Sequence, residues 1–331
     1  MKTKKILSLI MAVVMMLSVV ALCVSCSEDN SGKKGKYTIG IMQLVTHDAL
    51  DAATEGFMQA VKDKLGEENV EFDLQNAAGS TDTCATIANS FVNKKVDLIM
   101  ANATPALQAA YNATAEIPIL GTSVTEYGVA LGIKDFSGVV GSNVSGTSDL
   151  ASLDSQAQMI LDLVPTAKTV GLVYCSSEAN SDYQVKKVKA YLEGKGITCK
   201  DYAFSDSNDV STVVGNAVSE CDALYVPTDN TAASCAETIY GAMGENKKPI
   251  IAGEAGVCSG CGIATLSIDY YDLGYKTGEM AAEILLGNAK IEEMPIAYAP
   301  KETKKYNAKI CADLGIDVEA LKAAGYVAIE D

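Results

Sequence analysis

Polar side chains with ligand-binding chemistry follow several apolar, strand-like runs of the sequence. Residues 223–226 lead directly into Pro227, Thr228, Asp229 and Asn230. Hydroxyl and amide residues occupy similar positions behind other runs: Thr104, Ser123, Ser145, Thr147, Ser148 and Asn180. Ligands of open α/β sheets bind just outside the carboxyl ends of the strands. These side chains therefore form one candidate ligand site.

The two signs of charge expected in this site come from different residues. The chain contains no arginine, so an anion must be held by hydroxyl groups, lysine or backbone N–H groups at helix N-termini. We expect Thr104, Ser123 and the N–H groups around residues 145–148 to hold a carboxylate. Asp229, helped by Glu254, is expected to pair with an ammonium group. The alternative for each residue taken alone is a helix cap or a turn.

Catalytic, metal and nucleic-acid functions have little support. His47 is the only histidine, and no nucleophile elbow or phosphate loop stands beside a strand end. A net charge of -16 opposes binding to nucleic acid. Cys258 and Cys261 lack a second ligand pair for zinc, so they form either a small disulfide across a turn or two free thiols. We expect no enzyme, no cofactor and no metal.

The N-terminus reads as an export signal. Lys2, Lys4 and Lys5 precede the apolar run 6–22, and polar residues follow Cys26. We therefore predict a lipoprotein signal peptide over 1–25, lipidation of Cys26 and a flexible tether over 26–36. This places the protein outside the cytoplasm, lipid-anchored to the outer face of the cell membrane. The alternative is ordinary cleavage near Ser25, which yields a soluble secreted protein.

Alternating strand and helix patterns must position these residues. Residues 49–65, for example, carry Leu50, Ala53, Phe57, Ala60 and Val61 at helical spacing. Two successive runs of this alternation predict an α/β fold with two Rossmann-like lobes and parallel sheets. The expected lobes are 37–142 with 267–294, and 143–266 with 295–331. Three crossovers near 142–145, 266–267 and 295 would form the hinge.

Segments spread over almost the whole chain carry a family resemblance. They are residues 39–43, 47–52, 55–57, 102–106, 143–149, 178–181, 225–230 and 268–274. In these segments the chain resembles the substrate-binding lipoproteins of ABC importers in the tryptophan/tyrosine-binding (TrpX-like) family. The resemblance implies the type I periplasmic-binding-protein architecture, capture of an amino acid that is often aromatic, and its delivery to a permease. Residues 253–257 depart from the more acidic run that family members carry.

Together these observations predict an extracytoplasmic solute-binding component of an ABC importer. The expected ligand is a free amino acid, aromatic or large and apolar, bound in the cleft between the lobes of a monomer. Its side chain would pack on His47, Tyr127 or Tyr271. The alternatives are a sugar or nucleoside binder of the same fold, and a ligand-sensing receptor domain.

Overall fold

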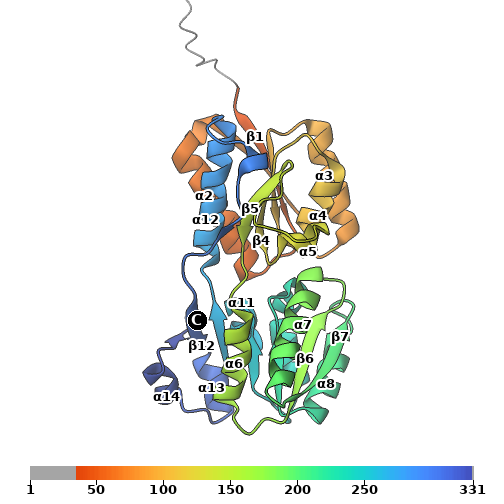
Figure 1. The fold of residues 1–331 in the computed structure, drawn as a ribbon, viewed down its shortest axis with the longest axis vertical. Helices are drawn as coiled ribbons and strands as arrows, with labels where there is room; N and C mark the ends of the chain where they lie inside the picture. Colours follow the sequence, from red (N-terminus) through yellow and green to blue (C-terminus); the bar gives the residue numbers. More distant parts are fainter. Residues whose placement is uncertain (1–34, 330–331) are drawn as a thin grey trace, which may run out of the picture. The chain divides into compact units, whose positions relative to one another are not determined.

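The computed structural model describes residues 35–329 (Figure 1). The predicted signal peptide, Cys26 and all of the tether except its last two residues lie outside that range. No helix within residues 35–329 is both long and apolar enough to cross a membrane.

The first lobe is built on a sheet of parallel strands in the order β11-β5-β4-β3-β1-β2. Its strands are β1 (Tyr37–Gln43), β2 (Val70–Asn76), β3 (Leu98–Asn102), β4 (Ile119–Val124), β5 (Val144–Ser148) and β11 (Ala297–Tyr298). Its helices are α2 (Asp48–Leu65), α3 (Thr81–Lys94), α4 (Thr104–Ala113), α5 (Tyr127–Leu131) and α12 (Tyr270–Leu285), with short 3-10 turns at Glu67–Asn69 and Ile291–Glu293. In Figure 1, α2 and α12 cover one face of this sheet, and α3 and α4 cover the other.

The second lobe is built on a sheet in the order β13-β12-β10-β9-β8-β6-β7, in which β12 runs antiparallel to β10. Its strands are β6 (Thr169–Cys175), β7 (Thr198–Phe204), β8 (Ala223–Val226), β9 (Ile250–Ala252), β10 (Ala264–Ser267), β12 (Thr303–Tyr306) and β13 (Val327–Ala328). Its helices are α6 (Leu153–Leu163), α7 (Ala179–Gly194), α8 (Val210–Glu220), α9 (Asn230–Ser234), α10 (Ala236–Ala242), α11 (Ala255–Cys261), α13 (Ala308–Asp313) and α14 (Val318–Ala323). The predicted two-lobed α/β architecture is confirmed.

The apolar pattern of the sequence explains both layers of the first lobe. Every residue of β3 is buried, as expected for a parallel strand that is covered by helices on both faces. The predicted apolar face of α2, including Leu50, Phe57 and Val61, is also buried. Burial of such side chains from water is the main force that holds a helix on a sheet.

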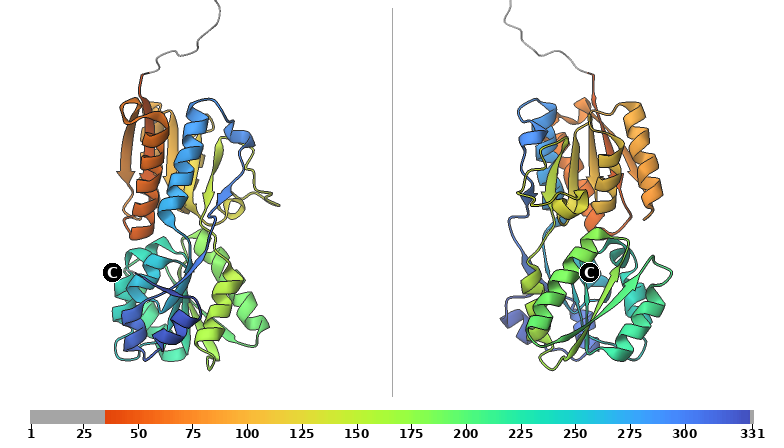
Figure 2. Two further views of the ribbon diagram at one scale, coloured as in Figure 1. Left: turned by 90° about the vertical axis from the view of Figure 1, so that its left-hand side faces the viewer. Right: turned by 45° about the vertical axis from the view of Figure 1, so that its right-hand side comes forward.

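Glycines let α2 and α12 approach each other closely, and Figure 2 shows the two helices side by side. A Cβ atom at Gly274 would lie 1.9 Å from the carbonyl oxygen of Ala53, and one at Gly56 would lie 2.1 Å from that of Tyr271. Only glycine leaves room for the facing backbone at these positions. This contact fixes the start of α12, which follows a crossover between the lobes.

The structure moves the predicted lobe boundaries. Residues 143–148 were assigned to the second lobe, but β5 pairs with β4 and β11 in the first sheet. Likewise β11 belongs to the first sheet, although 295–331 were assigned to the second lobe. The crossovers therefore follow β5, β10 and β11, close to residues 149–152, 268–269 and 299–302. An isolated antiparallel bridge between Val139 and Pro295 lies next to the β11 edge of the first sheet.

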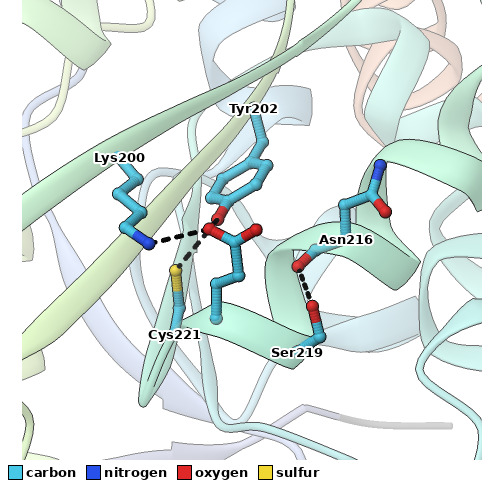
Figure 3. A network of polar contacts seen from close by, with 6 residues as sticks. Lys200, Tyr202, Asn216, Ser219 and Cys221 are labelled. Carbon is cyan, nitrogen blue, oxygen red and sulfur yellow. Dashed lines mark hydrogen bonds and ion pairs between the residues drawn. The ribbon is translucent and has the colours of Figure 1, made fainter.

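A polar network fastens the edge strand β7 to the end of α8 (Figure 3). Lys200 Nζ and the Tyr202 hydroxyl both donate to Glu220 Oε2, at 2.7 and 3.0 Å. The Cys221 thiol donates to the Tyr202 hydroxyl at 3.6 Å. Burial, together with the Cys221 and Glu220 groups, raises the pKa of Tyr202. The network ties the sheet edge to the helix that covers it.

Candidate functional site

The loops that follow the strands of the two lobes meet each other. Helix α5 contacts α7, and α2 contacts α11. The ring of His47, after β1, lies 3.4 Å from Asn230, measured from Nε2 to Oδ1. Because the Asn230 amide nitrogen donates to the Glu178 carboxylate at 2.6 Å, the amide oxygen is the atom that faces the histidine ring. Residues from both lobes thus form the candidate site.

Two hydroxyl groups of the first lobe are buried without a partner. Thr104 Oγ1 and Ser123 Oγ have no hydrogen-bond partner within residues 35–329. Thr104 begins α4, whose N-terminus has Ala103 at its cap position and no capping side-chain bond from the described residues. The backbone N–H groups and the positive end of this helix favour an anion.

Backbone strain marks the same place. Ala103 has φ 98° and Ser123 has φ 53°, both in the region that favours glycine. The pairing of β4 with β5 shifts register between Gly121 and Val124, and such irregularities re-aim side chains. Strained residues of this kind cost about 1–3 kcal/mol each and concentrate at ligand sites. The strain supports a binding role for Thr104 and Ser123.

Four carboxyl side chains are buried around the facing loops: Asp149, Glu178, Asp229 and Glu254. Glu178 accepts hydrogen bonds from Asn230 and Thr231, through backbone and side chain in each case, and from Asn180. Glu254 caps α11 by accepting from the backbone N–H groups of Gly256 and Val257. These bonds satisfy both oxygens of each group, as a buried carboxylate requires.

Asp229 is the N-cap of α9. Its Oδ1 accepts from the Ala232 backbone N–H at 2.8 Å, and its Oδ2 accepts from that of Cys175 at 2.7 Å. Burial and the neighbouring Glu178 raise the pKa of Asp229. Both oxygens therefore already have partners in the fold, and pairing of Asp229 with an ammonium group stays a prediction.

Asp149 differs from these carboxyls. It follows β5, is 4% exposed, and its Oδ1 has no hydrogen-bond partner in the described part of the chain. The Tyr270 hydroxyl donates to Oδ2 at 3.1 Å. Burial raises the pKa of Asp149 to about 6, and nearby Glu254 adds to the rise, while hydrogen bonds from Thr125 and Tyr270 oppose it.

Asp149 should make stability depend on pH. Its pKa of about 6 lies above the ordinary value of 3.8, so the folded state holds a proton between these values that the unfolded chain releases. The charged form therefore destabilises the fold above pH 6, and the penalty fades as the pH falls towards 4. We expect the ligand-free Asp149→Asn variant to be about 2 kcal/mol more stable than the parent at pH 7.5, with the gap closing at pH 4.

Urea unfolding at several pH values measures this gap. The Asp162→Asn variant changes an exposed carboxyl of the second lobe and should stay within about 0.5 kcal/mol of the parent at every pH. A difference between Asp149→Asn and the parent that does not vary with pH would contradict the expectation.

Most of the remaining predicted site residues have partners in the fold. Ser145 Oγ donates to the Met294 carbonyl at 3.0 Å, and Ser148 Oγ to that of Thr125 at 2.8 Å. Thr147 Oγ1 lies 2.7 Å from Thr277 Oγ1. The Thr228 carbonyl accepts from the Asn180 and Gln184 side-chain amides. The ligand contacts of these residues stay predictions.

Asn180 and the aromatic candidates are placed differently. Asn180 Oδ1 is buried and has no partner among residues 35–329. Tyr127 is buried, and its hydroxyl donates to the Thr147 carbonyl at 3.1 Å. Tyr271 and Glu254 line a cavity of about 220 Å³ next to α2, and His47 lines another of about 420 Å³ with Asp48 and Asp51.

Asp149 and Glu178 are buried acidic residues that the sequence pattern does not single out as site residues. Each is an acidic residue beside a predicted helix start, where a carboxylate is ordinary. The available signal was position, because Asp149 directly follows the hydroxyl run that ends β5, and Glu178 follows β6 by a few residues.

The structure also shows the state of the cysteines and of side chains that could bind a metal. The eight cysteines that the structure describes are free, which selects the second of the two alternatives for Cys258 and Cys261. Both lie buried in α11 rather than across a turn. Burial raises the pKa of each thiol. No cluster of His, Cys, Asp and Glu among the described residues is suited to a metal ion.

Known proteins are similar to this chain in sequence and fold. Residues 38–326 match the family described as ABC transporter substrate binding protein. Over 304 residues the chain is 40% identical to the tyrosine-binding protein of Clostridioides difficile (strain R20291), which covers 89% of this chain and 88% of that protein. A solved ABC domain from Streptococcus pneumonia in complex with L-Trp is 33% identical, with a TM-score of 0.83 over 89% of this chain and 100% of that chain.

A second solved structure is also similar to this chain. The ligand-free, open structure of a substrate-binding protein with adhesive properties from Clostridium difficile is 40% identical and covers 89% of this chain and 100% of that chain. Its TM-score is only 0.66, although it is closer in sequence than the tryptophan complex. From the family match, the fold and the close relatives together, this chain belongs to the ABC transporter substrate-binding protein family.

Proposed function

We propose that this chain binds a free amino acid, aromatic or large and apolar, between its lobes and delivers it to an ABC permease. The observation that carries the proposal is the pairing of opposite unfilled groups. Thr104, at the start of α4, and Ser123, in β4, offer buried hydroxyl donors without a partner among residues 35–329, and Asp149 and Asn180 offer buried acceptor oxygens that lack one there. A zwitterion satisfies both sets at once.

The identity of the side chain rests on relatives. One relative carries the name tyrosine-binding protein, and another was solved with L-Trp. His47 lies at the contact between the lobes, and we propose that it packs on the aromatic ring of the ligand. Tyrosine and tryptophan are therefore the first ligands to test.

The location and partners follow from the family. Substrate-binding proteins of ABC transporters act outside the cytoplasm and hand their ligand to a permease. For this chain we propose a lipid anchor on Cys26 at the outer face of the cell membrane, and a monomeric binding unit. Closure of the lobes around the ligand would present the permease with a surface that the open form lacks.

Calorimetry with the twenty amino acids tests the proposal on protein that has been unfolded and refolded to remove any bound ligand. We expect tyrosine or tryptophan to bind most tightly. Binding of a sugar or a nucleoside in place of every amino acid would overturn the assignment.

The Thr104 hydroxyl provides a residue-level prediction. Thr104→Val keeps the shape of the side chain and removes a donor to the ligand carboxylate. A hydrogen bond to a charged group contributes about 1.5–3 kcal/mol, so L-tyrosine should bind about 10- to 100-fold more weakly. Thr86→Val on exposed α3 is the control and should bind as the parent does. A change below threefold at Thr104 would show that its hydroxyl does not meet the ligand.

A further inference from the structure

We propose that Asp149, at the first crossover, accepts the ammonium group of the bound amino acid on Oδ1, and that Tyr270 holds Oδ2 from the second crossover. The inference rests on the proposed function, since it assigns one end of the same ligand. It differs from the expectation drawn from the sequence, which gave this role to Asp229.

The four buried carboxyl groups differ in how many of their oxygens already accept hydrogen bonds. Asp229 uses both oxygens on backbone N–H groups, and Glu254 does the same at the start of α11. Glu178 is filled by five donor groups. Asp149 Oδ1 is the carboxylate oxygen in this group that lacks a partner within residues 35–329. An unpaired buried carboxylate oxygen is costly unless a ligand completes it.

The charged groups around Asp149 also favour an ammonium group as its partner. None of the ion pairs of the described residues involves Asp149. The ionisable groups that act on it are Tyr270 at the start of α12, Tyr127 of α5 and Glu254 at the start of α11. None of these groups can carry a positive charge, so among the described residues the Asp149 carboxylate has no cationic partner. An ammonium group supplies that partner.

The position of Asp149 in the fold also supports this role. Its backbone N–H donates to the Val124 carbonyl at 3.3 Å, which sets Asp149 beside the residue that follows the unpartnered Ser123. On the other side the Tyr270 hydroxyl donates to Asp149 Oδ2 at 3.1 Å, and Thr228, whose carbonyl accepts from Asn180 at 3.1 Å, acts on the pKa of the same hydroxyl. Asp149 therefore lies beside the end of β4 that carries Ser123, and through Tyr270 it is linked to the segment of the second lobe that contacts Asn180.

This geometry also couples the ligand to the hinge. Asp149 follows β5 and Tyr270 follows β10, so their hydrogen bond joins two chain crossings between the lobes. A ligand whose ammonium group fixes Asp149 also fixes this bond. Tyr270 is thus a positioning residue for the site.

A ligand that lacks the ammonium group tests the assignment. Binding of L-tyrosine and of 3-(4-hydroxyphenyl)propanoate would be measured on the full chain, its Asp149→Asn variant and its Asp229→Asn variant. In the parent, loss of the ammonium group should weaken binding about 10- to 100-fold. In Asp149→Asn, tyrosine should lose a similar factor, and the propanoate should bind within threefold of its parent value or better. Asp229→Asn should keep the preference of the parent.

The outcomes separate the two proposals. A parent that binds neither tyrosine nor tryptophan contradicts the proposed function itself. A parent that prefers tyrosine, together with an Asp149→Asn variant that keeps this preference, overturns the role of Asp149 alone. Retained binding of the propanoate shows that the variant is folded. If Asp229→Asn loses the preference instead, the ammonium site belongs to Asp229.

Proton release gives a second readout. An ammonium group beside Asp149 should favour its charged form, so tyrosine binding near pH 6 should release protons in the parent. Calorimetry in two buffers of different ionisation enthalpy measures this release. It should be absent in Asp149→Asn and reduced or shifted in pH in Tyr270→Phe. Equal release in the parent and in Asp149→Asn would contradict the proposal.

Discussion

The Glu178→Ala variant is expected to lose about 3–5 kcal/mol of its free energy of unfolding. The Glu178 carboxylate is 3% exposed and accepts from the backbone and side-chain groups of Asn230 and Thr231 and from Asn180. The change leaves these donors without their charged acceptor. Relief of the repulsion with Asp229, whose pKa Glu178 raises, returns only part of the loss.

Urea unfolding measures the effect, and Glu193→Ala is the matched control. Glu193 lies exposed near the end of the same helix, α7, so its removal should change stability by no more than about 0.5 kcal/mol. Similar losses in the two variants would show that the Glu178 bonds contribute little. Ligand binding should also weaken in Glu178→Ala, because Asn180 and Asn230 lose the group that orients them.

The Gly274→Ala variant is expected to be destabilised by at least about 2 kcal/mol. The added Cβ would lie 1.9 Å from the Ala53 carbonyl oxygen and 2.6 Å from its carbon. Backbone atoms of α2 cannot turn aside as a flexible side chain can, so the two helices must separate. Alanine favours a helix over glycine by about 1 kcal/mol, which offsets the clash only in part.

Gly215→Ala is the matched control for this change, and its effect should have the opposite sign. Gly215 lies within α8, and a Cβ there meets nothing within 4 Å. The variant should therefore be stabilised by about 0.5–1 kcal/mol. Equal effects of the two substitutions in thermal or urea unfolding would contradict the close-packing account. Because α12 starts at Tyr270, Gly274→Ala should also weaken ligand binding.

The comparison of Asp149 with Asp229 shows how far the sequence could predict the site. Both are acidic residues at the end of a strand, and both stand next to hydroxyl or amide residues. Which one is free depends on a donor 54 positions away, the Cys175 backbone N–H that fills Asp229. A sequence pattern contains no information about that long-range contact. The pattern favoured Asp229 because a helix-like segment follows it.

The lobe boundary was misplaced for a similar reason. The segment 144–148 is short, and its serine, threonine and glycine residues are typical of a loop. They form a strand because β4 and β11 flank them and satisfy their backbone groups. The strand then carries Ser148 and Asp149 to the crossover, so the boundary error and the missed acidic residue have one cause.

The sequence by itself determined the two α/β lobes, the family and the collection of polar residues at strand ends. The lobes and the strand-end residues follow from local periodicity and from the rule that parallel strands place their carboxyl ends at one edge, whereas the family follows from the resemblance carried by eight segments of the chain. Only the tertiary structure decided which of those polar groups are satisfied within the fold and which stay open. Thr104, Ser123, Asp149 and Asn180 keep free polar atoms, whereas Ser145, Thr147, Ser148 and Asp229 do not. The physical reason is that hydrogen-bond partners of buried groups come from distant segments, which meet only when the chain has folded.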